Sequence, residues 1–437
     1  MTSTAAAPLD LIASSVAGYD PAAMPVPQAQ DFIARLVPRV QAVEHVALRS
    51  ALGRVLAHDV VSPIDVPSHD NAAMDGYALR GLDLATDGMT ELPIAGTGLA
   101  GQSVVSVVPP GFCVRIMTGA VMPDGLDTVV PQEFVTLLDD GRISVAAGLV
   151  RIGDNRRLRG EDLAKGEPAL RAGRIVKPAD LGVLASLGRA EVAVLRRLRV
   201  AFFSTGDELR SIGEPLDDGC VYDSNRYTLW GMLQRLGVEA LDFGVVRDDP
   251  DALREAFSRA AEAADVVITS GGVSLGEADH TKRIMAELGE VLFWRLAMRP
   301  GRPLAVGRIG GSSEISGGRR QAILFGLPGN PVAVMVTFYA FVRDALLAIA
   351  GATTDPLPTL HAATTTALRK KPGRTEYQRG TLQRGTDGRW QVTPTGAQGS
   401  GILHSMSQAH GLIVLSHTQG PVGAGELVEV IPFDGLA

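Results

Sequence analysis

The sequence predicts a multi-domain chain of the α/β plus β class, in which a parallel α/β domain is combined with β-rich domains. Strand and helix patterns alternate over residues 198–351, which is typical of a parallel sheet with helices on both faces. Residues 59–150 consist of short apolar runs broken by glycine and proline, and residues 352–437 carry many turns without long helical periodicity. The length of 437 residues suggests roughly two to four domains.

The N-terminal part of the chain is more mixed in character. Prolines over residues 21–27 predict a mobile lead-in segment. Apolar residues then recur at helical spacing, so a helical pattern is expected over residues 28–58. The residues that carry this pattern are Phe32, Ile33, Leu36 and Val40. Residues 151–197, which follow the first β-rich segment, are again mixed in character, without one dominant helical or strand pattern.

The α/β segment can be divided into its elements. We expect strands at 200–204, 241–246 and 266–268, and helices at 225–236, 250–264 and 332–350. The last helix is the most apolar, but Arg343 and Asp344 interrupt it. It is therefore predicted to be a core helix and not a membrane span.

Several turns of this segment favour an anion. The apolar run at 266–268 leads into Ser270, Gly271, Gly272 and Ser274, and small residues there let backbone N–H groups approach an oxyanion. An ordinary βα turn is the alternative interpretation. Further along the chain come three arginines, whose planar guanidinium groups suit oxyanions. After them comes a rigid turn, rich in proline and glycine, that leads into a helix N-terminus. These residues are Arg295, Arg299 and Arg302, and Pro328, Gly329 and Pro331.

Three carboxylates are expected at the same edge of the sheet. Glu208, Asp248 and Asp279 each follow a predicted strand, and ligands of open parallel sheets bind outside the carboxyl ends of the strands. Carboxylates that share such an edge repel one another unless a cation or a proton intervenes. The sequence therefore predicts a Mg²⁺ site. Two neighbouring aspartates have purely structural interpretations: Asp207 shapes a turn, and Asp249 caps a helix.

Composition excludes several classes of protein. The content is 46% hydrophobic and 20% charged, which is globular, and the net charge of −7 argues against nucleic acid as a partner. The two cysteines, Cys113 and Cys220, cannot form a disulfide framework, and Cys/His metal spacing is absent from the sequence. The segment through Asp20 does not resemble a signal peptide. We therefore expect a cytoplasmic protein with no membrane association.

Two further motifs lie in the β-rich segment at residues 69–80 and 115–120. By pattern alone they are turns of a β domain. Considered together with the α/β loops, however, they complete a set of motifs that resembles the MoeA family of molybdopterin molybdenumtransferases, and also the E domains of gephyrin and its plant counterpart. The set comprises 70–78 (DNAAMDGYA), 115–120 (RIMTGA), 204–209 (STGDEL), 222–226 (YDSNR), 247–250 (RDDP), 270–279 (SGGVSLGEAD) and 326–331 (GLPGNP).

This resemblance extends from about Gln28 to Pro432 and implies an organisation and an activity. Family members take adenylylated molybdopterin and molybdate and release molybdenum cofactor and AMP with Mg²⁺. Each subunit has four domains, and two subunits form an elongated homodimer. Each active cleft is shared between the two subunits. The implied domains are a discontinuous elongated domain I (28–58 and 151–197), a β-rich domain II (59–150), a MogA-like α/β molybdopterin-binding domain III (198–351) and a small β-barrel domain IV (352–437).

The resemblance also assigns residues. Asp75 and Thr118 match positions that complete the partner's cleft, and Asp248 with Asp279 would hold Mg²⁺. Arg374 and Ser400 match positions near the molybdate site. This chain departs from the family by carrying arginine where lysine is common, at 295, 299 and 302, and His280 where tyrosine is common. The positive charge is kept, while the geometry of the donor groups changes.

Two alternative functions stay open from the sequence. The α/β domain is similar to the MogA-type enzyme that adenylylates molybdopterin, so an adenylyltransferase is one of them, and a non-catalytic scaffold is the other. A MogA-type adenylyltransferase is also the expected supplier of substrate. Preference for molybdate or tungstate is not encoded in any motif described above.

Overall fold

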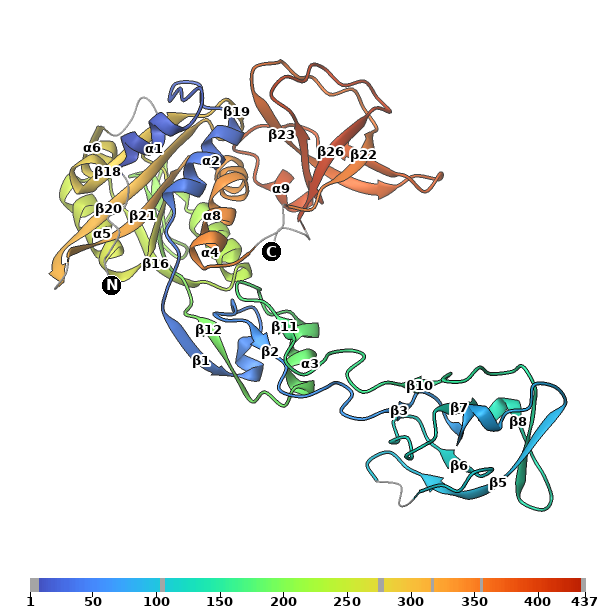
Figure 1. Cartoon of the computed structure of the whole chain (residues 1–437). Helices are drawn as coiled ribbons and strands as arrows, with labels where there is room; N and C mark the ends of the chain where they lie inside the picture. The colour runs from blue at the N-terminus through green and yellow to red at the C-terminus, as the bar shows by residue number, and fades with distance from the viewer. Residues whose placement is uncertain (1–7, 103–106, 274–278, 316–317, 354–356, 434–437) are drawn as a thin grey trace.

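The computed structural model describes residues 8–102, 107–273, 279–315, 318–353 and 357–433, without the side chains of 279 and 311–320. The molecule is elongated (Figure 1). A large α/β unit and a C-terminal barrel lie at one end, a small β unit lies at the other, and a narrow connecting region joins them.

The α/β unit is built on a six-stranded sheet in the order β16-β13-β17-β21-β20-β18. Its strands are β13 (Arg199–Thr205), β16 (Glu239–Val246), β17 (Val266–Ser270), β18 (Gly289–Arg295), β20 (Pro303–Ile315) and β21 (Gly318–Leu327). The first four strands in the sheet order are parallel, as the alternating pattern predicts. β20 pairs antiparallel with both β21 and β18. The sheet is therefore mixed, because β20 and β21 follow each other so closely in the chain that they can pair only in the antiparallel sense.

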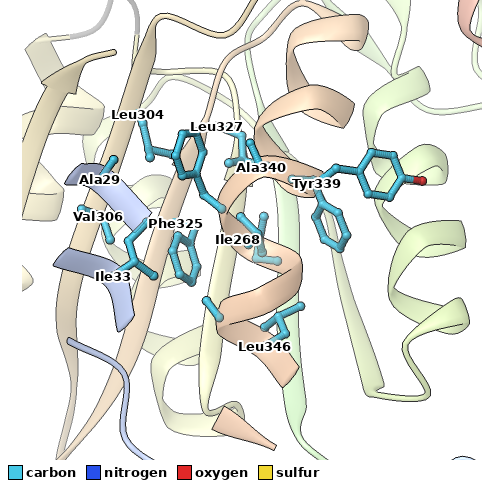
Figure 2. Close-up of a cluster of buried hydrophobic side chains, with 14 of the residues drawn as sticks. Ala29, Ile33, Ile268, Leu304, Val306, Phe325, Leu327, Tyr339, Ala340 and Leu346 are labelled. Carbon is cyan, nitrogen blue, oxygen red and sulfur yellow. The ribbon is translucent and has the colours of Figure 1, made fainter. Parts of the chain in front are cut away.

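Helices cover both faces of this sheet. On one face lie α5 (Pro250–Ala263) and α6 (Asp279–Leu288). The other face is covered by α1 (Leu9–Ser15), α2 (Val26–Leu36), α4 (Ser224–Arg235), α7 (Pro331–Thr337) and α8 (Arg343–Ile349). Side chains alternate along the strands, so that Phe202 contributes to one core and Phe203 to the other. Figure 2 shows Ile33 of α2 beside Phe325 of the sheet, and Ile268 belongs to the same hydrophobic cluster.

The prediction for the N-terminal segment is wrong in part. Helix α2 ends at Leu36, because Pro38 lacks an N–H group and disfavours helical backbone at the preceding residue. Beyond it the chain forms β1 (Val43–Ala47), which pairs with β12 (Glu191–Leu195). The lead-in segment is also packed and not mobile, since Met24 is fully buried and its N–H group donates to the carbonyl of Arg295.

The long apolar helix is observed as α7, a π-helical turn (Phe338–Val342) and α8. Within the described residues, Pro331–Ile349 is the one stretch that has the length and apolar composition of a membrane span. However, 78% of its most apolar window is buried inside the protein, where it packs on the sheet. The observation agrees with a core helix.

The connecting region consists of two passes of the chain that pair with each other. β1 pairs with β12, β2 (Val60–Val61) pairs with β11 (Pro168–Leu170), and β3 (Asn71–Ala72) pairs with β10 (Arg156–Arg157). Helix α3 (Pro178–Ser186) packs beside the second pass. These pairings stabilise the region although its core is small.

The far β unit contains a six-stranded sheet in the order β7-β4-β6-β5-β9-β8. Its strands are β4 (Gly76–Leu79), β5 (Met89–Gly98), β6 (Cys113–Ile116), β7 (Thr128–Pro131), β8 (Val135–Leu137) and β9 (Arg142–Ala146). Cys113 is fully buried in this unit, and burial raises the pKa of its thiol to about 12. It is a core side chain, in keeping with the absence of a disulfide framework.

The C-terminal unit is a closed five-stranded barrel. Its strands are β22 (Leu360–Thr364), β23 (Thr375–Arg384), β24 (Trp390–Pro394), β25 (Gly411–Leu415) and β26 (Leu427–Pro432), and the additional pairing of β23 with β25 closes the ring. β19 (Met298–Arg299) pairs in parallel with β23. This pairing joins the barrel to the chain segment just before β20.

Candidate active site

A cavity of about 830 Å³ lies where the carboxyl ends of the parallel strands meet the barrel. Its walls come from the loops after β13, β16, β17 and β21, from residues 299–303 and from the barrel loop at 398–400. The cavity brings together eleven of the residues expected from the sequence: Glu208, Asp248, Ser270, Gly271, Gly272, Arg299, Arg302, Pro328, Gly329, Arg374 and Ser400.

Other expected residues do not line this cavity or are not described. Arg295 lies on β18, where its backbone N–H donates to the carbonyl of Pro21. Pro331 is the first residue of α7 and sets the helix start. Ser274 lies outside the described residues, and of Asp279 only the backbone, which begins α6, is described.

Asp75 and Thr118 form a pair of their own in the far β unit. The backbone N–H group and the hydroxyl of Thr118 both donate to Oδ1 of Asp75, each at 2.7 Å. These two hydrogen bonds lower the pKa of the Asp75 carboxyl. The pair is separated from the cavity of its own chain by the whole connecting region (Figure 1). One chain alone therefore does not bring these residues to the cavity.

The turn after β17 requires glycine at two consecutive positions. A Cβ atom at Gly271 would lie 2.5 Å from the carbonyl oxygen of Thr205, and one at Gly272 would lie 2.7 Å from the side chain of Thr281. Both glycines have positive φ angles, 97° and 67°. The N–H group of Gly271 donates to the carbonyl of Leu327. Because this N–H group is paired with a backbone carbonyl, it is not available to bind an anion.

A buried polar network lies beneath the cavity. Asp223 caps α4, with its Oδ1 accepting hydrogen bonds from the Arg226 N–H group at 3.2 Å and the Ser204 hydroxyl at 3.0 Å. Nδ2 of Asn225 donates to the Ser270 hydroxyl at 2.8 Å and to the Gly329 carbonyl at 2.7 Å. Asn225 therefore joins the two glycine-containing turns and lines the cavity.

Neither Asp223 nor Asn225 was among the candidate residues from the sequence. Both residues lie in the 222–226 motif, and Asp223 stands two residues before the helix predicted at 225–236, where an aspartate is a common helix cap. That signal marks the start of the helix, but it does not show that the cap lies below two turns that line the cavity.

We expect Asp223→Ala to lower the free energy of unfolding of the α/β unit by about 2 kcal/mol, because it removes a helix cap and leaves the Ser204 hydroxyl unpaired in the interior. Urea denaturation monitored by the fluorescence of Trp294, which is buried in this unit, measures the change. Asp218→Ala is the matched control, since Asp218 is exposed. Equal stability of the two variants would contradict the capping role.

The charges that line the cavity are separated. Glu208 and Asp248 follow β13 and β16 at one edge of the sheet. Arg302 precedes β20, which is separated from β13 by β17 and β21. At about 5 Å between neighbouring strands, β13 and β20 are roughly 15 Å apart, so the acidic and basic side chains start from well-separated backbone positions. This span suits an elongated ligand that carries anionic groups at more than one place.

At the basic end, Arg374 is paired with a carboxylate. Its Nε donates to Oε1 of Glu376 at 2.8 Å, and Glu376 is 4% exposed. Arg299 and Arg302 line the same cavity, and Arg299 lies opposite Glu376 in the pairing of β19 with β23. The excess of arginine over carboxylate makes this end of the cavity suitable for an oxyanion.

The acidic end fits Mg²⁺ by its donor set. Mg²⁺ is usually bound by one or two carboxylates together with phosphate oxygens of a substrate. Glu208 and Asp248 supply two carboxylates on one wall of the cavity. No group of three His, Cys, Asp or Glu side chains with metal-binding geometry occurs within the described residues. The metal would therefore depend on substrate oxygens, or on a carboxylate outside this set.

The fold and the cavity define a multi-domain protein with a large cavity between an α/β sheet and a barrel. Three family models match the chain: the MoeA N-terminal region, domains I and II, over 24–188; a probable molybdopterin binding domain over 201–348; and the MoeA C-terminal region, domain IV, over 361–433. The chain belongs to the MoeA family.

Individual relatives agree with this assignment. The chain is 40% identical over 410 residues to the molybdopterin molybdenumtransferase of Haemophilus influenzae, covering 94% of this chain and 98% of that protein. It is 30% identical to gephyrin of Dictyostelium discoideum over 89% of this chain and 59% of that protein. A crystal structure of the molybdopterin biosynthesis MoeA protein of Pyrococcus horikoshii superposes with a TM-score of 0.79 at 28% identity, covering 94% of this chain and all of that one.

Proposed function

We propose that this protein is a molybdopterin molybdenumtransferase, which converts adenylylated molybdopterin and molybdate into molybdenum cofactor and AMP. The observation that carries the proposal is the cavity itself, which combines a carboxylate end with an arginine end. The 40% identity to an enzyme of that name, over almost its whole length, supports the choice of substrate.

The proposed substrate fits the separation of charge. Its phosphoanhydride needs charge neutralisation and positioning more than it needs a nucleophilic side chain of the protein. Asp248 and Asp279 would hold Mg²⁺, which supplies charge neutralisation at the phosphates when it is bound. Glu208 borders the same end of the cavity. Apart from the N–H group of Gly271, which is paired within the protein, Ser270, Gly272 and Arg299 would hold phosphate oxygens.

The arginine end would hold molybdate. Arg302, Arg374 and Ser400 line it and offer guanidinium and hydroxyl donors to a small dianion. Water would add to the phosphorus as the phosphoanhydride is cleaved, and AMP would leave from the acidic end. The two dithiolene thiols would then give their protons to one oxygen of molybdate, which departs as water while the two sulfurs become ligands of the molybdenum. Arg295 lies outside the cavity and would act only through its charge at a distance.

We further propose that the active unit is a homodimer. Asp75 and Thr118 lie far from the cavity of their own chain, at the outer end of an elongated molecule. In a dimer, Asp75 and Thr118 of the partner subunit would reach the cavity and complete it. We propose that the dimer works in the cytoplasm and receives its substrate from a MogA-type adenylyltransferase.

The decisive experiment measures AMP released from adenylylated molybdopterin at fixed Mg²⁺, with and without molybdate. Release that depends on molybdate supports the proposal. Consumption of ATP in the presence of unmodified molybdopterin would instead identify an adenylyltransferase. Tight binding of adenylylated molybdopterin without release, with tungstate as well as molybdate, would identify a scaffold.

A further inference from the structure

Arg379 is a fully buried arginine of the barrel that has no carboxylate partner within the described residues. It lies in the middle of β23 and has an exposed fraction of 0%. Its Nε donates to the Ser405 hydroxyl at 2.9 Å, and its Nη2 donates to the carbonyls of Ala397 and Gly399 at 3.0 Å each. Its Nη1 has no hydrogen-bond partner there. The side chain is therefore held firmly while its charge is left unneutralised.

A buried charge of this kind costs free energy unless an opposite charge lies near. Burial lowers the pKa of Arg379, and the neighbouring positive charge of Arg299 lowers it further. The nearby carboxylate, Glu376, is already paired with Arg374. Lys370, which is also buried, donates only to backbone carbonyls. The barrel side of the cavity thus has more positive charge than its own carboxylates neutralise.

Arg379 also fixes the loop that lines the cavity. The side chain of Gln398 accepts from the Arg379 N–H group at 2.8 Å and donates to the Arg379 carbonyl at 3.1 Å. At the end of the loop, the carbonyl of Ser400 accepts from the N–H group of Val332 at 3.0 Å. The loop at 397–400 is therefore held between β23 and the start of α7, and three of its residues face the cavity.

We infer that Arg379 is a positioning residue for oxyanion binding, which holds the 397–400 loop in place and sets an unneutralised positive charge behind it. Such a charge stabilises a bound dianion more than a monoanion of the same shape, because the Coulomb energy scales with the charge of the ligand. The inference rests on the proposed function, in which the ligand at this end is molybdate.

The test compares molybdate with perrhenate, a tetrahedral oxyanion of similar size that carries a single negative charge. Calorimetric titration at fixed ionic strength measures the dissociation constant of each anion for the unaltered protein, Arg379→Gln and Arg379→Lys. We expect Arg379→Gln to weaken molybdate binding by about tenfold or more and perrhenate binding clearly less. Arg379→Lys keeps the positive charge but loses the planar guanidinium that holds the 397–400 loop. The binding of both anions should therefore be weakened by a similar factor.

Ser405→Ala serves as the second variant, because it removes one hydrogen bond to Arg379 and keeps the charge. We expect a loss of a few fold for both anions with the preference for molybdate retained. Thermal unfolding of each variant reports whether the barrel is intact. If Arg379→Gln does not fold, unchanged binding in Ser405→Ala would still overturn the positioning role.

Equal weakening of molybdate and perrhenate binding by Arg379→Gln would overturn the role of the charge and leave the proposed function standing. Failure of the unaltered protein to bind either anion would contradict the molybdate site itself, and with it this inference. The two kinds of failure are therefore distinguishable.

Discussion

Asp248→Asn is expected to reduce Mg²⁺-dependent release of AMP by about a thousandfold, because a metal ion at the phosphates contributes several kcal/mol to transition-state stabilisation. Asp248 lies in the loop after β16 and lines the acidic end of the cavity. Asparagine has nearly the same shape, so the change removes a charged metal ligand with little disturbance of packing. Single-turnover assays at saturating molybdate, repeated over a range of Mg²⁺ concentrations, measure the effect.

Asp251→Asn is the control for this variant, because Asp251 follows closely in the chain but points to solvent from the first turn of α5. It should retain full activity. Asp279→Ala should resemble Asp248→Asn if the two carboxylates share the metal. Near-normal turnover by Asp248→Asn at all Mg²⁺ concentrations would contradict the proposed metal site.

Mixing two inactive variants is expected to restore activity. In a homodimer with shared cavities, Asp75→Ala and Asp248→Asn damage opposite halves of each cavity. A mixed dimer then has one cavity with both defects and one with neither. Random exchange of subunits makes half of the dimers mixed, so about a quarter of the unaltered activity should return. Each pure variant should remain inactive.

The control mixture combines Asp248→Asn with Glu208→Gln, which alter the same half of the cavity. In that mixture every cavity carries one defect, so activity should stay low. Recovery equal in both mixtures, or absent from both although subunits exchange, would contradict a cavity shared between Asp75 of one subunit and Asp248 of the other.

The α/β part of the site could be predicted from sequence because strand ends are easy to locate. Four apolar runs end in loops with glycine or carboxylate residues, and parallel strands place such loops at one edge. Glu208, Asp248 and Ser270 meet there for this reason. The closed barrel is likewise consistent with short strands separated by turns.

Other features depend on tertiary contacts that no local pattern records. Helical spacing at Val40 continued the pattern of α2, but Pro38 and the pairing of β1 with β12 ended the helix. The charge of Arg379 is ordinary in sequence, and its burial becomes visible only once β23 is part of a barrel. The roles of Asp75 and Thr118 depend on a second subunit, so they rest on family resemblance and remain a prediction.

The short pairing of β19 with β23 has a mechanical consequence. It places Arg299 opposite Glu376 on the barrel, while Glu208 and Asp248 follow strands of the sheet. Arg302 follows closely and leads directly into β20 of the sheet, and Tyr377, Met406 and Leu412 of the barrel region belong to the same hydrophobic cluster as the sheet. One shared core therefore sets the spacing between the two sides of the cavity, so a substitution in that core would change the spacing without touching any residue that lines the cavity.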